Sequence, residues 1–279
     1  MKNLPKKILV VPDEIKQYLQ GDVFEALMQM SGKAFRDVPG RKTIQVALGR
    51  KSYFIKQHFG VGWGEIFKNL LTFKMPILGA MTEVKAIQKL VEISIATTPL
   101  VAYGQQGYSP ACLNIASLRS FVMTEDLGDI ESLEDICADW QVNPPNAVFK
   151  QNIIISIAQL AAKLHSAGLC HRDFYLCHFV FKKDELNNDN LNLYLIDLHR
   201  MLQGQTANSS AVMKDIAGLY FSMQQAGLGA EDWEVFKQYY LPQSAQFWEQ
   251  VEARSEALLT KFNSEKFQKR LSVEKSALD

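Results

Sequence analysis

Polar and hydrophobic residues alternate along several segments of the N-terminal half, as they do in half-buried strands. Residues 43–48 and 52–56 alternate in this way on either side of Gly49-Arg50-Lys51, a combination that predicts a β-hairpin. Residues 31–40 are rich in turn formers. Further strands are expected at residues 97–107 and 120–127, and helices at residues 23–30 and 82–91.

A helical period of hydrophobic residues dominates the remainder of the chain. It is strongest at residues 149–165, and Gly168 lies just beyond that segment. Other helices are expected at residues 132–140, 213–227, 230–240 and 243–271. The pattern predicts an α+β protein with two lobes, an N-terminal lobe at 1–124 built on an antiparallel sheet and a mainly helical lobe at 125–279.

The charge of the chain is balanced, with 30 Lys and Arg against 30 Asp and Glu among 279 residues. Such a chain has no net field that would attract nucleic acid, so we predict no nucleic-acid partner. An anionic partner would have to meet a local basic patch.

Cysteine usage and hydropathy indicate the compartment. The four cysteines form no CxxC pair and no dense framework, which favours a reducing environment. The N-terminal apolar run is too short for a signal peptide, and no uncharged apolar stretch has the length of a transmembrane helix. We therefore expect a soluble cytoplasmic protein, with attachment to a membrane surface left open.

Two aspartates in the C-terminal half are candidate catalytic or metal-binding residues. Asp173 closes a His171-Arg172-Asp173 loop after the helix at 149–165, and Asp197 follows an apolar run. In protein-kinase-like phosphotransferases the first such Asp orients the acceptor hydroxyl and the second holds Mg²⁺. The plainer alternatives are a turn residue that caps its loop, for Asp173, and a turn residue at a strand end, for Asp197.

A kinase-like site also needs a lysine for the phosphates and a carboxylate that orients this lysine. Lys56 leaves an otherwise apolar strand, and Glu83 lies on the apolar face of the predicted helix at 82–91. Taken alone, Lys56 would be a solvent-exposed lysine and Glu83 a helix-edge carboxylate. Their order ahead of the His-Arg-Asp loop favours the functional interpretation.

Asp215 has two interpretations that the sequence leaves open. It is either a carboxylate favoured by the dipole at a helix start or a buried anchor that accepts hydrogen bonds from the His-Arg-Asp loop. The neighbouring cysteines and histidines do not have the spacing of a common zinc site, so we interpret them as packed structurally. The residues considered for zinc are Cys170, His171, Cys177, His178 and His199, and the structural interpretation applies to His171 and the two cysteines.

The stretch His-Arg-Asp-Phe-Tyr-Leu-Cys-His-Phe at 171–179 closely resembles the catalytic loop of the bacterial lipopolysaccharide core heptose kinases. Segments similar to that family extend over residues 35–240, among them 52–56, 75–80, 124–127, 138–145 and 196–200. The resemblance implies a two-lobed protein-kinase-like fold that uses ATP and Mg²⁺. It also implies an acceptor hydroxyl on the first heptose of lipopolysaccharide inner core, at the cytoplasmic face of the inner membrane.

The resemblance also implies roles for individual residues. Asp173 would be the catalytic base, Lys56 the phosphate lysine and Glu83 its partner. Asp197 would bind the metal. Backbone groups of Glu125 and Leu127 would contact adenine. Apart from the resemblance, we predict that His171, Arg172 and Asp215 give structural support to the loop.

Two departures from the general kinase pattern stand out. His178 occupies the position where protein kinases carry a metal-binding Asn, and Mg²⁺ prefers oxygen ligands, so His178 is a poor metal ligand. A bond to a phosphate or the positioning of Asp197 are its alternatives. A glycine-rich phosphate loop is also missing, the nearest stretch being residues 31–40.

A phosphorylated, membrane-bound acceptor would require a local basic surface on this protein. Peripheral contact with the membrane is a further expectation. The expected helix at 65–74 has an aromatic and leucine face that fits either the bilayer or the protein core. Two other functions remain open: a kinase for another sugar such as Kdo, and a kinase-like protein that binds nucleotide or glycolipid without catalysis. The candidate basic residues are Arg41, Lys42, Arg50, Lys51, Lys68 and Lys74.

Overall fold

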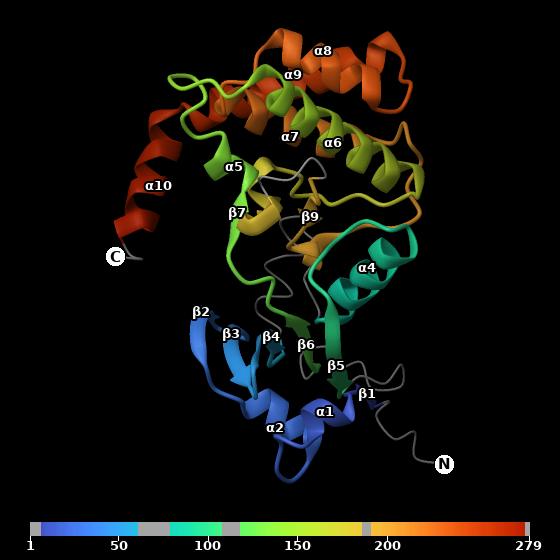
Figure 1. The fold of residues 1–279 in the computed structure, drawn as a ribbon, viewed down its shortest axis with the longest axis vertical. Helices are drawn as coiled ribbons and strands as arrows, with labels where there is room; N and C mark the ends of the chain where they lie inside the picture. The colour runs from blue at the N-terminus through green and yellow to red at the C-terminus, as the bar shows by residue number, and fades with distance from the viewer. Residues whose placement is uncertain (1–6, 61–78, 108–117, 186–190, 277–279) are drawn as a thin grey trace. The chain divides into compact units, whose positions relative to one another are not determined.

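The computed structural model describes residues 7–60, 79–107, 118–185 and 191–276. By its internal contacts the chain divides into two compact units. The first comprises residues 1–129 together with 196–200, and the second comprises residues 130–195 and 201–279 (Figure 1). The short segment 196–200 therefore belongs with the N-terminal unit although it follows much of the C-terminal one in sequence.

The first unit is built on a six-stranded sheet in the order β1-β5-β6-β4-β3-β2. All neighbouring strands in it are antiparallel. The predicted hairpin is confirmed, because β3 and β4 pair on either side of Gly49-Arg50. The strands are β1 Ile8–Val10, β2 Lys33–Val38, β3 Arg41–Leu48, β4 Lys51–His58, β5 Leu100–Gln106 and β6 Arg119–Glu125.

Alternation along β4 gives this sheet two different faces. Tyr53 and Ile55 point into a hydrophobic core that the short helices α1 (Asp13–Lys16) and α2 (Val23–Gln29) complete with Ile15, Phe24 and other apolar residues. Lys56 points to the opposite face. Helix α4 (Met81–Glu92) packs on β5, on β6 and on η4 (Leu198–Arg200), a 3₁₀ turn.

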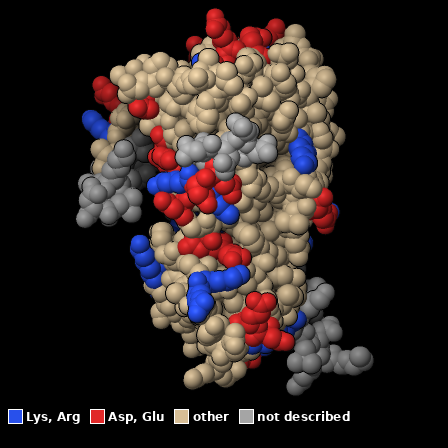
Figure 2. All heavy atoms as spheres, in the orientation of Figure 1, with Lys and Arg blue, Asp and Glu red and all other residues tan. Residues whose placement is uncertain are grey.

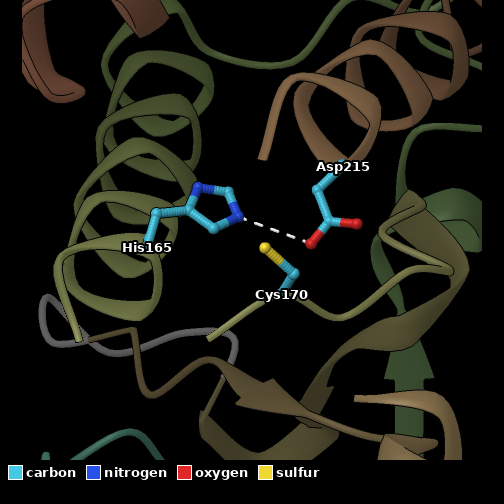
Figure 3. A group of neighbouring side chains, drawn as sticks. All are labelled: His165, Cys170 and Asp215. Carbon is cyan, nitrogen blue, oxygen red and sulfur yellow. Dashed lines mark hydrogen bonds and ion pairs between the residues drawn. The ribbon is translucent and has the colours of Figure 1, made fainter. Parts of the chain in front are cut away.

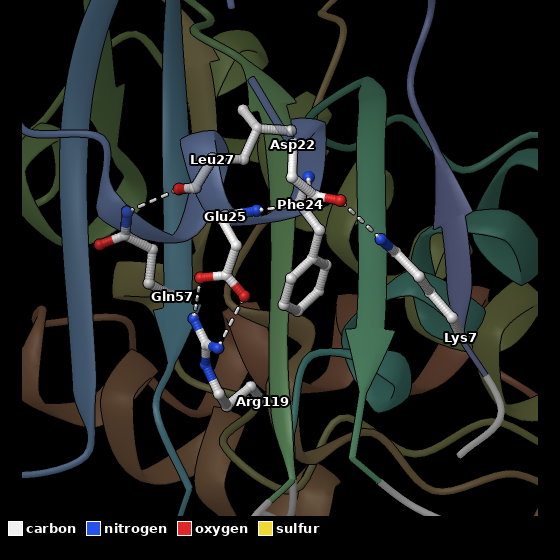
Figure 4. A network of polar contacts seen from close by, with 7 residues as sticks. All are labelled: Lys7, Asp22, Phe24, Glu25, Leu27, Gln57 and Arg119. Atoms are coloured by element: carbon white, nitrogen blue, oxygen red, sulfur yellow. Dashed lines mark hydrogen bonds and ion pairs between the residues drawn. The ribbon is translucent and has the colours of Figure 1, made fainter. Parts of the chain in front are cut away.

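Polar contacts join α2 to the sheet (Figure 4). Arg119 on β6 donates two hydrogen bonds of 2.8 Å to the two carboxylate oxygens of Glu25. Its guanidinium also lies 5.6 Å from the ring centre of Phe24. Gln57 on β4 donates to the carbonyl of Leu27 over 2.8 Å. A planar guanidinium that binds a carboxylate with two parallel bonds fixes orientation as well as distance.

The second unit consists of helices and a three-stranded sheet, β7-β8-β9. Helix α6 packs on α8, and α7 packs on α9. Stacked rings fill the space between α7 and α8, since Trp233 lies 4.1 Å from Tyr220 and 4.7 Å from Phe236 between ring centres. The strands are β7 Ile130–Ser132, β8 Phe179–Lys182 and β9 Tyr194–Leu195. The helices are α5 Leu133–Ile136, α6 Ala147–Ser166, η2 Leu176–His178, η3 Lys183–Glu185, α7 Ser210–Gln225, α8 Ala230–Tyr239, α9 Ala245–Phe262 and α10 Glu265–Ser276.

The predicted α+β class is confirmed, with an antiparallel sheet in the N-terminal part and helices in the C-terminal part. Three predicted elements were wrong. The turn-rich stretch at 31–40 contains β2, all of whose residues are exposed, so that no burial pattern marked it. The helix at 132–140 ends at Ile136, and the helix at 243–271 is two helices separated at Asn263-Ser264.

Some predictions lie outside the described residues. They are the helix at 65–74 with Lys68 and Lys74, and the environment of Cys112. Within the described part of the chain, no helix is both long and apolar enough to cross a membrane. On the face drawn in Figure 2, Lys and Arg side chains lie interspersed with Asp and Glu side chains, as expected from the balanced charge.

Candidate active site

A cluster of charged side chains lies within the first unit. Lys56 Nζ lies 2.6 Å from Glu83 Oε1 and 3.6 Å from Asp197 Oδ1. The side chain of Glu83 is 5% exposed and that of Lys56 is 20% exposed. The structure therefore brings together three residues that are far apart in the sequence and that the sequence singled out.

The local sequence explains how each member reaches the cluster. Lys56 follows the core residue Ile55 and so emerges on the other face of β4. Glu83 lies in the first turn of α4, on the helical face that also buries Val84 and Ile87. A carboxylate at this depth is stable only with a cationic partner, which Lys56 supplies.

Asp197 adopts an unusual backbone conformation, with φ of 61°. Its Oδ1 lies 2.6 Å from Nδ1 of His199, two residues later. Aspartate tolerates the left-handed region better than most residues, but such conformations still cost free energy and gather at functional sites. The bend places the Asp197 carboxylate beside Lys56. An extended backbone at this residue would direct the carboxylate elsewhere.

In the second unit, Asp215 holds the His-Arg-Asp loop through the backbone. The backbone N–H of His171 donates to Asp215 Oδ2 over 2.6 Å, and that of Arg172 donates to Oδ1 over 2.8 Å. Asp215 is buried and lies beyond the first turn of α7. Of the two interpretations of Asp215, the geometry is that of the buried acceptor. Arg172 itself has φ of 73°, a conformation that these bonds hold in place.

Asp215 also belongs to a buried group with His165 and Cys170 (Figure 3), whose ligand atoms lie within 4.8 Å of one another. The group is not suited to a metal. Asp215 already accepts two backbone N–H groups, and His165 Nδ1 lies 2.7 Å from the hydroxyl of Tyr240. Burial, with Asp215 nearby, raises the pKa of the Cys170 thiol to about 12, whereas zinc binds the thiolate. We interpret the group as the anchor of the loop.

The segment after Asp173 is fixed on both sides. Phe174 is buried, with its ring centre 4.8 Å from that of Phe179. The N–H of Leu176 donates to Ser222 Oγ over 3.1 Å. His178 Nδ1 lies 2.6 Å from the backbone carbonyl oxygen of Asp173. The imidazole of His178 thus contacts the backbone of Asp173, while Asp173 keeps a half-buried side chain.

The two residues expected near adenine lie at and after the end of β6. Glu125 donates its backbone N–H to the carbonyl of Pro99 over 2.9 Å, and its side chain lies 3.1 Å from Lys51 Nζ. The hydrogen bond with Glu125 raises the pKa of Lys51. Leu127 follows, half-buried, in the segment between β6 and β7.

Several residues of these arrangements were missed by sequence reasoning. His165 continues the apolar face of α6 that carries Ala158 and Ala161, and this spacing could have indicated a buried histidine. Ser222 and Tyr240 gave no signal of their own, because their partners are distant in sequence.

Comparison with known proteins gives the relationships of the chain. Residues 25–240 match the model of the lipopolysaccharide kinase (Kdo/WaaP) family. The lipopolysaccharide core heptose(I) kinase WaaP of Pseudomonas aeruginosa is 39% identical over 80% of this chain and 82% of its own. The enzyme of the same name from Escherichia coli K12 is 39% identical over 78% of this chain and 82% of its own.

A solved structure extends the similarity to three dimensions. The structure of WaaP in complex with acyl carrier protein covers 90% of this chain and 99% of that one, with a TM-score of 0.75 and 32% sequence identity. The matched region contains the charged cluster and the loop around Asp173. The chain belongs to the lipopolysaccharide kinase (Kdo/WaaP) family.

Proposed function

We propose that this protein is an ATP-dependent kinase that phosphorylates a hydroxyl of the first heptose of the lipopolysaccharide inner core. The observation that carries the proposal is the identity of 39% to heptose(I) kinases over about four fifths of the chain. The ion pair of Lys56 and Glu83, with Asp197 beside it, agrees with a kinase site.

Asp173 is the proposed catalytic base. Phosphoryl transfer depends on positioning more than on covalent help, so the task of this carboxylate is to orient the heptose hydroxyl and accept its proton late. The hydrogen bonds from the backbone of His171 and Arg172 to Asp215 support this role, because they fix the chain directly before Asp173. We assign His171, Arg172 and Asp215 to the support of the loop.

Lys56 is the proposed phosphate-binding lysine, with Glu83 holding its ammonium in place. Four buried side-chain atoms in the first unit have no hydrogen-bond partner among the described residues. Two of them, Glu83 Oε2 and Arg41 Nε, support a polar ligand there. The Asp197 carboxylate supplies the oxygen ligand that Mg²⁺ prefers. When bound, Mg²⁺ would neutralise charge on the ATP phosphates.

His178 fits a positioning role better than a metal-binding role. Its Nδ1 is engaged by the carbonyl of Asp173, and an imidazole is a poor Mg²⁺ ligand. We propose that it stiffens the turn that carries the base. Backbone groups of Glu125 and Leu127 are the proposed adenine contacts, the N–H of Glu125 being already bound to Pro99.

The proposed acceptor implies where in the cell the protein acts. Because inner core is assembled on a lipid anchor, we propose that the protein acts at the cytoplasmic face of the inner membrane as a peripheral protein. In this scheme residues 1–124 form the ATP-binding lobe and residues 125–279 the catalytic and acceptor-binding lobe. The absence of a spanning helix among the described residues agrees with peripheral attachment.

Acyl carrier protein is a proposed further partner. The support is the solved relative, which is similar over 90% of this chain and is a complex of WaaP with acyl carrier protein. Co-expression followed by size-exclusion chromatography tests the assignment. Co-elution of the two proteins at a fixed ratio is expected, and separate elution would contradict it.

The function is tested by incubating the protein with ATP, Mg²⁺ and lipopolysaccharide core from which phosphate has been removed. Tandem mass spectrometry then locates any new phosphate. Phosphate on the first heptose is the expected result. Phosphate on Kdo would instead support the other sugar kinase, and nucleotide binding without transfer would support a non-catalytic protein.

A further inference from the structure

Arg41 and His58 lie on the same face of the N-terminal sheet as Lys56. In the pairing of β3 with β4, Arg41 is opposite His58 and Thr43 is opposite Lys56. Directly opposed residues share a face, and so do residues two apart on one strand. Arg41, His58 and Lys56 therefore form a compact group at one end of the two strands.

The hairpin turn before Arg41 is fixed to the end of β4. The N–H of Phe59 donates to the carbonyl of Gly40 over 2.9 Å, and a Cβ on Gly40 would lie 2.8 Å from the carbonyl oxygen of Gly60. Gly40 also has φ of 79°, which favours glycine. The backbone of Arg41 is therefore held in place by its immediate surroundings.

Two nitrogen atoms of this group are buried without a partner. Within the described residues, neither Arg41 Nε nor His58 Nε2 finds a hydrogen bond, and His58 is only 5% exposed. Buried donors and acceptors in folded proteins are nearly always paired, and leaving one unpaired costs about 1–3 kcal/mol. Two neighbouring nitrogen atoms that lack hydrogen bonds point to a ligand that binds them in the functional protein.

The charge of Arg41 indicates the sign of that ligand. Burial lowers the pKa of Arg41, and the neighbouring carboxylates Glu83 and Asp197 act in the opposite direction. None of the described carboxylates forms an ion pair with Arg41, while Glu83 is bound to Lys56. A partly desolvated guanidinium without an ion pair is a suitable site for an anion, and its planar fork matches phosphate geometry.

We propose that Arg41 binds the terminal phosphates of the nucleotide and that His58 is a positioning residue for its guanidinium. The inference rests on the proposed kinase function. Protein kinases cover the phosphates with backbone N–H groups of a glycine-rich loop, which this chain lacks. Here β2 and β3 form a hairpin, and the side chain of Arg41, next to the hairpin turn, does that work.

Nucleotide binding by the full chain tests this proposal without relying on turnover. Isothermal titration with adenosine, ADP and a non-hydrolysable ATP analogue is compared for the wild type, Arg41→Met and Arg41→Lys. In Arg41→Met the loss of a charged hydrogen-bonding partner is expected to lower the affinity for the ATP analogue and for ADP about 10- to 100-fold. Adenosine affinity should stay unchanged, and Arg41→Lys should lie between.

A matched control and a stability measurement complete the design. Lys89→Gln removes an exposed lysine of α4 in the same unit and should leave all three affinities as in the wild type. Since Arg41→Met removes a poorly paired charge, the urea midpoint of the free protein should not fall. His58→Gln should lower the affinity for the ATP analogue less than Arg41→Met does.

The outcomes separate this inference from the function on which it rests. Equal affinities for the ATP analogue in the wild type and Arg41→Met would overturn the role of Arg41 while leaving the kinase function standing. An equal loss of adenosine affinity would also overturn it, because the effect would not depend on phosphate. A wild type that binds no ATP analogue would overturn the kinase function and the inference together.

Discussion

Lys56 and Glu83 carry one charge each into a largely buried position in the first unit, and the 2.6 Å contact makes each charge depend on the other. A buried ion pair adds little stability relative to apolar residues, yet removal of one partner alone is costly because the remaining charge has no compensation. The pair is better understood as a device that holds an ammonium in one place.

This dependence can be measured. Lys56→Met should lower the free energy of unfolding by roughly 2–4 kcal/mol, because Glu83 is left buried and unpaired. The double variant Lys56→Met with Glu83→Gln should recover much of the loss. Urea unfolding of the wild type, both single variants and the double variant gives the coupling energy. Additive losses in the double variant would contradict the account.

His58 gives the first unit a defined response to acid. Burial, followed by the charges of Arg41, Lys56 and His199, lowers the pKa of His58 from 6.5 to about 3. The folded protein therefore holds His58 neutral where the unfolded chain would bind a proton. Its contribution to stability is fully present above pH 6.5 and is lost as the pH falls toward 3.

The expected slope is about 1.4 kcal/mol per pH unit below the unfolded pKa, so acidification from about pH 6.5 to about pH 5 should cost about 1–2 kcal/mol through His58. Urea unfolding at several pH values measures it. The variant His58→Gln should show a shallower dependence over the same interval. Identical slopes in the two proteins would show that His58 is not buried in its neutral form.

At the scale of elements, α7 and the loop before Asp173 are joined by one side chain. Asp215→Ala should lower the free energy of unfolding by roughly 2–4 kcal/mol, because the buried N–H of His171 and the part-buried N–H of Arg172 lose their acceptor. Asp215→Asn keeps one carbonyl oxygen and should lose about half as much. Urea unfolding measures both variants. Wild-type stability in Asp215→Ala would contradict the anchoring role.

The elements that sequence predicted well are those with a buried stripe. Helices α4 and α6 have apolar residues at helical spacing, and each was placed within two residues of its bounds. Strand β2 had no such signal, since it pairs with β3 at the edge of the sheet and all its residues are exposed. The break between α9 and α10 also escaped, although Ser264 accepts hydrogen bonds from Phe267 and Gln268 there.

At the scale of the whole molecule, what could be predicted followed from local pattern and from a family resemblance. Composition and periodicity indicated an α+β protein, and the order of Lys56, Glu83, Asp173 and Asp197 indicated kinase-like chemistry. The contacts that complete these arrangements depend on pairing between distant segments. Asp215 reaches back 44 residues to His171, and periodicity contains no information about such a partner.

Sequence alone predicted Arg41 only as part of a basic surface, because its partners also come from other segments of the chain. Its position opposite His58 depends on the register of β3 with β4, and its burial depends on the packing around that face. Neither is encoded in spacing along the chain. The described structure therefore adds a phosphate-binding candidate that the sequence left among several surface cations.

The central claim is that Asp173 is the base of a heptose kinase, and the rate of phosphate transfer from ATP to dephosphorylated core tests it most directly. Asp173→Asn should lower turnover by about 10²-fold or more, as expected when a positioned base is lost. Asp184→Asn, which neutralises an exposed carboxylate in the same unit, should keep the wild-type rate. Near-wild-type transfer by Asp173→Asn would contradict the account.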